Sequence, residues 1–140
     1  MDHRTVTAED LGRSLRGVGV NLLCRDVPAT ARFLCDTFGL RLLRDSTDFA
    51  LLGHGDALVQ LHSDASFRAH PALALVPEAG SRGGAVQIYL FGVDPDAAAA
   101  RAPAAGGTVI EPPIDKPHGL REATILGPEG HAFSPAMARQ

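Results

Sequence analysis

The feature of this sequence that most constrains its fold is an internal repeat with an offset of 68 residues. Asp26 and Asp94 each stand where a helix can begin, because an aspartate side chain can cap the first backbone N–H groups of a helix. Gly39 and Gly107 follow after equal intervals, and glycine commonly comes just after a helix end. The shared offset predicts two copies of one supersecondary motif.

Each copy has the pattern of a strand, a helix and three further strands. Apolar runs bounded by turn residues predict the strands at 18–24, 40–44, 49–52, 57–62, 85–91, 108–111, 120–126 and 131–134. The second helix is expected at 97–105, with its last turn frayed by Pro103. The expected fold class is α+β, with two βαβββ repeats that pair into a curved eight-stranded sheet around a shared cleft.

This pattern also predicts the domain organisation. A short arm with a helical turn occupies 1–16, and a single domain occupies 17–137. Within the domain the repeats are 17–63 and 85–137. The Pro- and Gly-rich segment 64–84 connects them.

Composition excludes several classes of partner. The net charge of −3 and the pI near 6.0 argue against nucleic acid and against an anionic membrane surface. No apolar stretch reaches the ~20 residues of a membrane-spanning helix, and the charged N-terminal segment does not resemble a secretory signal. Cys24 and Cys35 are the only cysteines and form no metal-binding motif, which predicts a reduced, cytoplasmic location.

Five segments resemble the vicinal oxygen chelate superfamily, which includes glyoxalases, bleomycin-resistance proteins and extradiol dioxygenases. They are Arg25–Phe33, Asp36–Leu40, Gly106–Pro113, Pro117–Glu122 and Gly127–His131. The resemblance spans about 17–137 and implies the paired-repeat fold already inferred from the offset. Because this superfamily is functionally broad, the fold alone does not give the function.

The resemblance also implies where a metal would be bound. Metal-dependent members place ligands on the first and fourth strands of each repeat, and these positions carry over to Gly19, Gln60, Gln87 and Ser134. None is His, Asp, Glu or Cys, the residues that bind zinc or non-haem iron. We therefore expect no metal and no other cofactor, which disfavours a metal-dependent lyase or dioxygenase.

Strand alternation predicts which polar side chains line the cleft. The expected ligand-binding residues are Asn21, Gln60, His62, Gln87, Tyr89, Phe91 and Ser134, and the resemblance adds Arg121 near the cleft mouth. His62 and Tyr89 are also candidates for acid–base catalysis. Exposed positions are expected for the other five histidines, His131 among them.

Two functions remain open at this point. The first is metal-independent binding of a small organic ligand, such as an antibiotic or another natural product, sequestered in the cleft between the repeats. The alternative is a metal-independent isomerase, cyclase or lyase that acts on a small biosynthetic intermediate. The resemblance also implies a homodimer, with the repeats paired within one chain or exchanged between chains.

Overall fold

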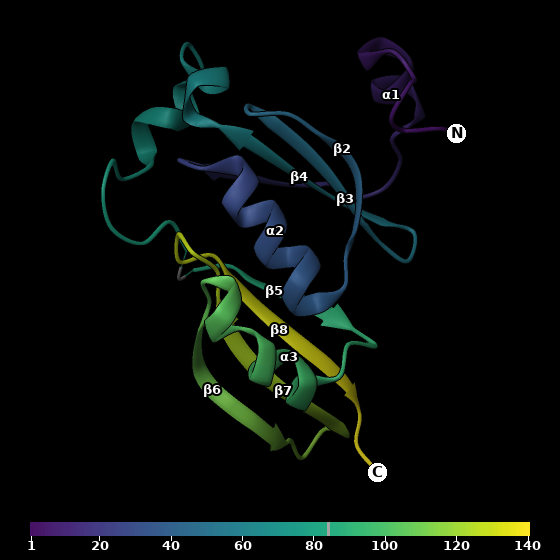
Figure 1. Ribbon diagram of the computed structural model, residues 1–140, viewed down its shortest axis with the longest axis vertical. Helices are drawn as coiled ribbons and strands as arrows, with labels where there is room; N and C mark the ends of the chain where they lie inside the picture. The colour runs from purple at the N-terminus through teal and green to yellow at the C-terminus, as the bar shows by residue number, and fades with distance from the viewer. Residues whose placement is uncertain (84) are drawn as a thin grey trace.

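The computed structural model describes residues 1–83 and 85–140, and its eight strands form two four-stranded sheets (Figure 1). The first sheet has the order β1-β4-β3-β2 and the second has the equivalent order β5-β8-β7-β6. The first repeat comprises β1 (Val20–Cys24), α2 (Val27–Phe38), β2 (Arg41–Asp45), β3 (Phe49–His54) and β4 (Ala57–Ser63). The second comprises β5 (Gln87–Phe91), α3 (Pro95–Arg101), β6 (Thr108–Asp115), β7 (Leu120–Leu126) and β8 (Ala132–Ala138). The predicted α+β class and the two βαβββ repeats are confirmed.

The predicted helix starts are confirmed, but one predicted helix end is wrong. Asp26 caps α2 by accepting from the Ala29 N–H, and Asp94 caps α3 in the same way. α2 ends at Gly39, with φ of 74°. In the second repeat the helix was expected to continue to Ala105 and stop at Gly106 and Gly107. The α-helix itself ends at Arg101, the 3-10 turn η3 (Pro103–Ala105) follows, and Gly106 is the left-handed residue. Position 107 requires glycine for another reason, because a Cβ atom there would lie 2.5 Å from Cε1 of Phe33.

Two strands of the second sheet are longer than predicted. β6 continues to Asp115 through Pro112 and Pro113, beyond the strand end predicted at residue 111. These prolines are tolerated because β6 is an edge strand, where a missing N–H donor need not break the sheet. β8 continues to Ala138, which places the C-terminal residues in the sheet.

The helix-covered sides of both sheets pack into one continuous core. α2 contacts α3, and buried side chains from the two repeats, among them Leu61 and Leu90, belong to the same cluster. Phe33 and Phe38 of α2 have ring centroids 6.0 and 5.6 Å from that of Phe133 on β8. Burial of large aromatic side chains is a major source of folding energy, so each repeat is stabilised by the other.

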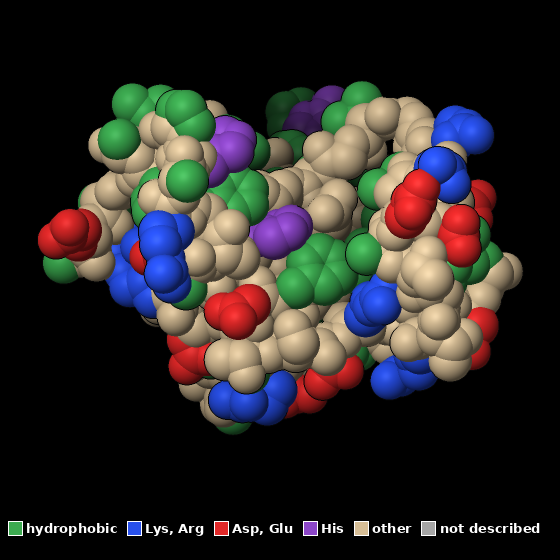
Figure 2. Space-filling model, turned by 90° about the horizontal axis from the view of Figure 1, so that it is seen from above, with side chains coloured by type: hydrophobic (Ala, Val, Ile, Leu, Met, Phe, Trp, Pro, Cys, Tyr) green, Lys and Arg blue, Asp and Glu red, His purple; other side chains and the backbone are tan. Residues whose placement is uncertain are grey.

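This packing leaves the opposite side of each sheet without a helix. Figure 2 looks down on the first repeat from above and shows a hollowed surface where histidine and apolar side chains lie among polar ones. The sequence predicted that these sides would face each other across one cleft. In the structure the helix-covered sides meet instead, and the two uncovered faces belong to separate sheets.

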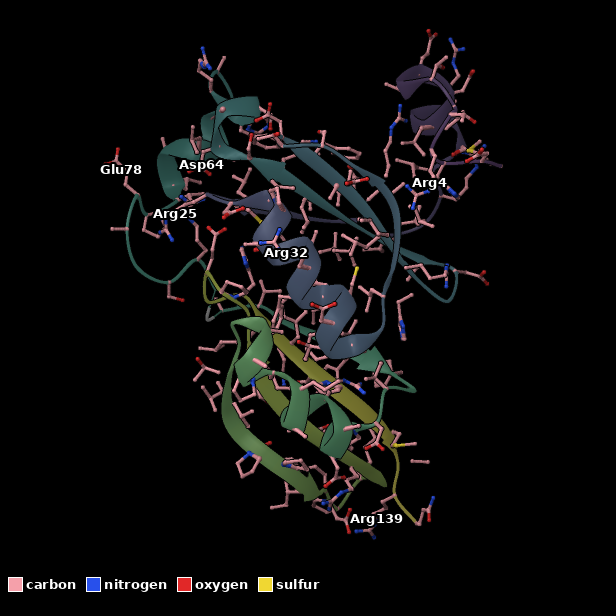
Figure 3. All side chains as sticks on the ribbon, viewed as in Figure 1. Arg4, Arg25, Arg32, Asp64, Glu78 and Arg139 are labelled. Carbon is pink, nitrogen blue, oxygen red and sulfur yellow. The ribbon has the colours of Figure 1, made fainter. Side chains whose placement is uncertain are left out.

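Arg25 fastens the connector between the repeats. Its guanidinium donates to the backbone carbonyls of Glu78 and Gly80 at 2.8 and 2.7 Å, and Figure 3 shows Arg25 beside Glu78 and Asp64. The described part of the connector contains two 3-10 helices, η1 (Asp64–Phe67) and η2 (Pro71–Leu75).

The N-terminal arm contains α1 (Ala8–Ser14), capped by Thr7. Within the described residues, no helix has the length and apolar character needed to cross a membrane.

Candidate functional site

The uncovered face of the first sheet carries an imidazole in aromatic surroundings. His62 on β4 lies between Phe49 and Phe67, at ring-centroid distances of 4.9 and 5.2 Å. Its Nδ1 is 2.6 Å from Oδ1 of Asn21 on the neighbouring strand β1. Because an amide oxygen only accepts, Nδ1 carries the proton and Nε2 keeps its lone pair. Burial lowers the pKa of His62, which favours this neutral form.

Gln60 completes the predicted polar set on this face. It is directly opposite Asn21 in the parallel β1–β4 pairing and lies two residues before His62, so all three share one side of the sheet. The strand-alternation prediction for Asn21, Gln60 and His62 is therefore correct at the level of a single sheet.

The uncovered face of the second sheet carries the remaining predicted side chains, except Arg121. Gln87 donates from Nε2 to Oγ of Ser134 at 2.7 Å, and Thr124 lies 3.2 Å from the same oxygen. The Tyr89 hydroxyl donates to Oε1 of the buried Glu122 at 3.3 Å.

Tyr89 also stacks on Phe91, with ring centroids 5.3 Å apart. Burial, followed by the neighbouring Glu122 carboxylate, raises the pKa of Tyr89, so this phenol stays protonated at neutral pH.

Arg121 makes ion pairs within the second repeat. Its guanidinium donates two hydrogen bonds to Asp96 at the start of α3, at 2.7 and 2.9 Å, and one to Asp115 at 3.2 Å. These hydrogen bonds raise its pKa further above an already high value. In the structure this arginine joins β7 to α3 and to the end of β6, away from the two polar faces described above.

The structure thus brings the predicted lining residues together in two groups rather than one. Asn21, Gln60 and His62 form the first group, and Gln87, Tyr89, Phe91 and Ser134 form the second. The hydrogen bonds that these side chains make stay within one sheet and do not join the two groups. Alternation along a strand fixes which residues share a face, but not which other sheet that face meets.

The positions that hold a metal in some relatives do not fit one here. Gly19 has no side chain, Gln60 is a neutral amide, and Gln87 and Ser134 use their polar atoms on each other. Zinc and non-haem iron require imidazole, carboxylate or thiolate ligands. Within residues 1–83 and 85–140, no three His, Cys, Asp or Glu side chains are grouped to hold a metal ion.

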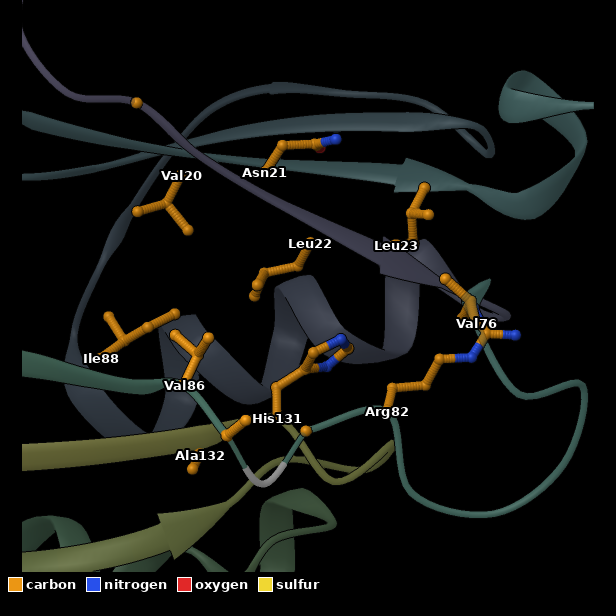
Figure 4. Close-up of a pocket in the computed structure, with 13 residues that line it drawn as sticks. Val20, Asn21, Leu22, Leu23, Val76, Arg82, Val86, Ile88, His131 and Ala132 are labelled. Atoms are coloured by element: carbon orange, nitrogen blue, oxygen red, sulfur yellow. The ribbon is translucent and has the colours of Figure 1, made fainter. Parts of the chain in front are cut away.

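A cleft of about 530 Å³ lies between the two repeats, where β1 passes the start of β5 and β8 (Figure 4). Most of its lining is aliphatic, from Val20, Leu22, Val86 and Ile88. Figure 4 shows Val20 and Leu22 pointing toward the second repeat, whereas Asn21 points away from it. Among the predicted ligand-binding residues, Asn21 contributes to the lining of this cleft, whereas the others lie outside it.

Sequence reasoning missed several residues of these surfaces. His131 was expected at the surface, yet it is 6% exposed and lines the cleft between the repeats. Phe67 lies in the connector, where no periodic pattern could place it beside His62. Glu122 is next to Arg121, which was predicted as a ligand-binding residue. No pattern in the neighbouring sequence indicated that Glu122 would be buried beside Tyr89. Phe49 could have been found, because β3 pairs antiparallel with β4 and puts it opposite His62.

Comparison with known proteins identifies the family. The family model for the Glyoxalase/Bleomycin resistance protein/Dioxygenase superfamily matches residues 18–134. No curated protein matches significantly.

Several solved structures share the fold. A glyoxalase-related enzyme from Fulvimarina pelagi is similar, with a TM-score of 0.70, 20% identity and 88% coverage of both chains. A glyoxalase/bleomycin resistance protein/dioxygenase family enzyme from Burkholderia phytofirmans PsJN has a TM-score of 0.70 and 22% identity, over 86% of this chain and 97% of that one. TioX from Micromonospora sp. ML1 has a TM-score of 0.63 and 26% identity, over 89% of this chain and 100% of its own. The chain therefore belongs to the glyoxalase/bleomycin resistance protein/dioxygenase family of the vicinal oxygen chelate superfamily.

Proposed function

We propose that this protein binds a small organic molecule, such as an antibiotic or another natural product, without a metal ion, in the cleft between its repeats. The observation that carries the proposal is the cleft itself. Its volume of about 530 Å³ falls in the ~300–1,000 Å³ range of small-molecule sites. Aliphatic side chains from both repeats would bury the body of such a ligand. Relatives of this fold include bleomycin-resistance proteins by family name, which agrees with a sequestering role.

A metal-independent isomerase, cyclase or lyase is the second candidate, and one observation favours it. The hydrogen bond to Asn21 fixes the proton of His62 on Nδ1, so Nε2 is a free base on the uncovered face of the first sheet. Burial lowers the pKa of His62 and keeps that base unprotonated at neutral pH. A neutral imidazole between aromatic side chains can remove a proton from a bound substrate.

We further propose a homodimer in which a second copy covers the uncovered sheet faces. The face of the second sheet presents Phe91, which is 60% exposed, and the exposed Ile114 lies on the same sheet. The predicted polar residues are split between two faces that do not meet within one chain. A second copy would cover the apolar side chains and could bring the two groups together. Sedimentation at several concentrations tests this, and a monomer at every concentration contradicts it.

The location proposed for this binding protein is the cytoplasm. Cys24 and Cys35 are both free thiols, as is usual in a reducing compartment. The net charge of −3 gives no support for a nucleic-acid partner.

The test combines binding with product analysis. The purified chain is screened against a panel of natural-product antibiotics by thermal shift, and each hit is then incubated and analysed by mass spectrometry. A bound compound that is recovered with unchanged structure supports sequestration. A rearranged or cleaved product that depends on His62 supports the enzyme instead.

Two matched variants locate the binding site. Val86→Trp fills the cleft and should abolish binding, whereas Val18→Trp adds the same side chain at a position that is 94% exposed and does not line the cleft. Loss of binding in Val86→Trp alone supports the cleft. Full binding by a folded Val86→Trp variant contradicts it.

A further inference from the structure

The cleft between the repeats contains one buried polar side chain whose hydrogen bonding is incomplete. His131 precedes β8 and rises into the cleft toward β1 (Figure 4). It is 6% exposed, and its Nδ1 atom has no hydrogen-bond partner among the described residues. A buried polar atom without a partner costs roughly 1–3 kcal/mol, so its presence requires an explanation.

The surroundings of His131 define what Nδ1 can do. Burial is the largest influence and lowers the pKa of the ring; nearby Arg82 and Arg25 act in the same direction, and Glu129 and the Leu23 backbone oppose them. The imidazole is therefore neutral at pH 7, with one N–H and one lone pair. The Leu23 backbone raises the pKa of His131, as a carbonyl that accepts from the ring does. Because Nδ1 is the ring nitrogen without a partner, we assign the proton to Nε2, which leaves Nδ1 as an acceptor.

The charged groups near His131 are already paired. The Arg82 guanidinium donates two hydrogen bonds to Asp64, at 2.6 and 2.7 Å, and a third to the Pro77 carbonyl at 3.0 Å. The Glu129 carboxylate accepts from two backbone N–H groups at the start of α2. Because the Arg82 charge is balanced by Asp64 and the Glu129 carboxylate is held by backbone N–H groups, these side chains favour a neutral ligand over a charged one.

From these contacts we infer that the cleft takes a neutral, mainly apolar molecule whose hydroxyl group donates a hydrogen bond to Nδ1 of His131. The apolar body of the molecule lies against Val20, Leu22, Val86 and Ile88. This inference rests on the proposed binding function of the cleft, and it adds the class of ligand and the residue that selects it.

A matched pair of fluorescent probes tests the inference on the full chain. 2-Naphthol has the donor hydroxyl, and 2-methoxynaphthalene has the same rings without it. We expect 2-naphthol to bind about tenfold more tightly, which corresponds to one hydrogen bond of about 1.4 kcal/mol. His131→Phe keeps an aromatic ring but removes the acceptor, so the two probes should then bind almost equally. His70 is exposed and lies outside the cleft, so His70→Phe should keep the tenfold ratio.

The outcomes separate this inference from the proposed function. If both probes bind the natural chain equally, the cleft still binds small molecules, but the role of His131 is wrong. If neither probe binds, the proposed function of the cleft fails as well. If His131→Phe does not fold, nitrogen NMR of the natural chain decides the question. Saturating 2-naphthol should shift the Nδ1 resonance of His131, and an unchanged resonance overturns the inference.

Discussion

The Glu129 carboxylate accepts a hydrogen bond from the backbone N–H of Arg25, with 2.6 Å between Oε1 and the nitrogen. These residues are 104 positions apart and belong to different repeats. Oε2 of the same carboxylate accepts from the backbone N–H of Asp26, at 3.0 Å. The last turn of the second repeat thereby fixes the chain where α2 begins, and Arg25 in turn holds the connector.

Replacing Glu129 should destabilise the whole fold. Glu129→Ala leaves two backbone N–H groups at the start of α2 without their acceptor, in a region where Glu129 is only 9% exposed. We expect the free energy of unfolding in urea to fall by about 2–3 kcal/mol. Glu9→Ala is the control, since it removes an exposed ion pair with Arg13, and it should change stability by less than ~0.5 kcal/mol. Equal effects of the two variants would contradict the role given to Glu129.

The phenylalanine cluster should make the two repeats unfold together. Phe33 is fully buried in α2, yet it contacts Phe133 and packs against Gly107 and Gly127 of the second repeat. Phe33→Ala should cost about 3–5 kcal/mol, because it leaves a cavity between the repeats. Far-ultraviolet circular dichroism and tyrosine fluorescence should report one common transition in urea. Two separate transitions would show that each repeat is stable alone.

Stability should decrease as the pH falls below about 6.5. Burial lowers the pKa of His62 and His131 from the ordinary value of 6.5, so below that pH the unfolded chain binds protons that the folded chain does not. Their contribution is complete above pH 6.5 and is lost as the pH falls through the lowered values. Urea unfolding at pH 7.5, 6.5 and 5.5 measures this.

A double variant assigns that pH dependence to the two histidines. The decrease between pH 7.5 and 5.5 should become much smaller in His62→Ala/His131→Phe. The lowered pKa values of Asp64 and Asp96 act only in more acidic solution, so they do not obscure the comparison. An unchanged decrease in the double variant would exclude the two histidines as its source.

The proton position on His62 should depend on Asn21. In the natural chain nitrogen NMR should show the proton on Nδ1, because Oδ1 of Asn21 lies 2.6 Å away and can only accept. Asn21→Leu removes this acceptor and should shift the tautomer toward Nε2–H, the form more common in free histidine. The resonances of His118 are the internal reference, since its ring lies beside Glu122 in the second repeat. An identical His62 tautomer in both chains would show that Asn21 does not fix it.

Both cysteines should react slowly with Ellman's reagent at pH 8. Burial raises the pKa of Cys24 to about 12, and the pKa of Cys35 is raised for the same reason. Because the thiolate is the reacting form, native protein should react far more slowly than protein in denaturant. Cys35 is only half-buried and should react first, which Cys35→Ser identifies by removing the faster phase. Rapid reaction of both thiols in native protein would contradict their burial.

Local sequence signals were sufficient for the repeats and for most of their elements. The capping aspartates and the apolar runs act through neighbouring residues, so they predicted both helices and all eight strands. Alternation also grouped Asn21 with His62, and Tyr89 with Phe91, on common faces. Gly107 reflects a tertiary cause, because the close approach of Phe33 requires glycine there independently of helix termination.

The sequence by itself therefore determined the two βαβββ repeats and the side chains that share each sheet face. Only the tertiary structure decided which face of one repeat meets the other. Alternation is a property of a single strand, whereas the meeting of the repeats depends on contacts such as Phe33 with Phe133, far apart in the chain. Burial of those rings holds the helix-covered sides of the two sheets against each other. This packing places the predicted lining residues on two separate surfaces. It also forms a cleft between the repeats, and His131 lies in that cleft.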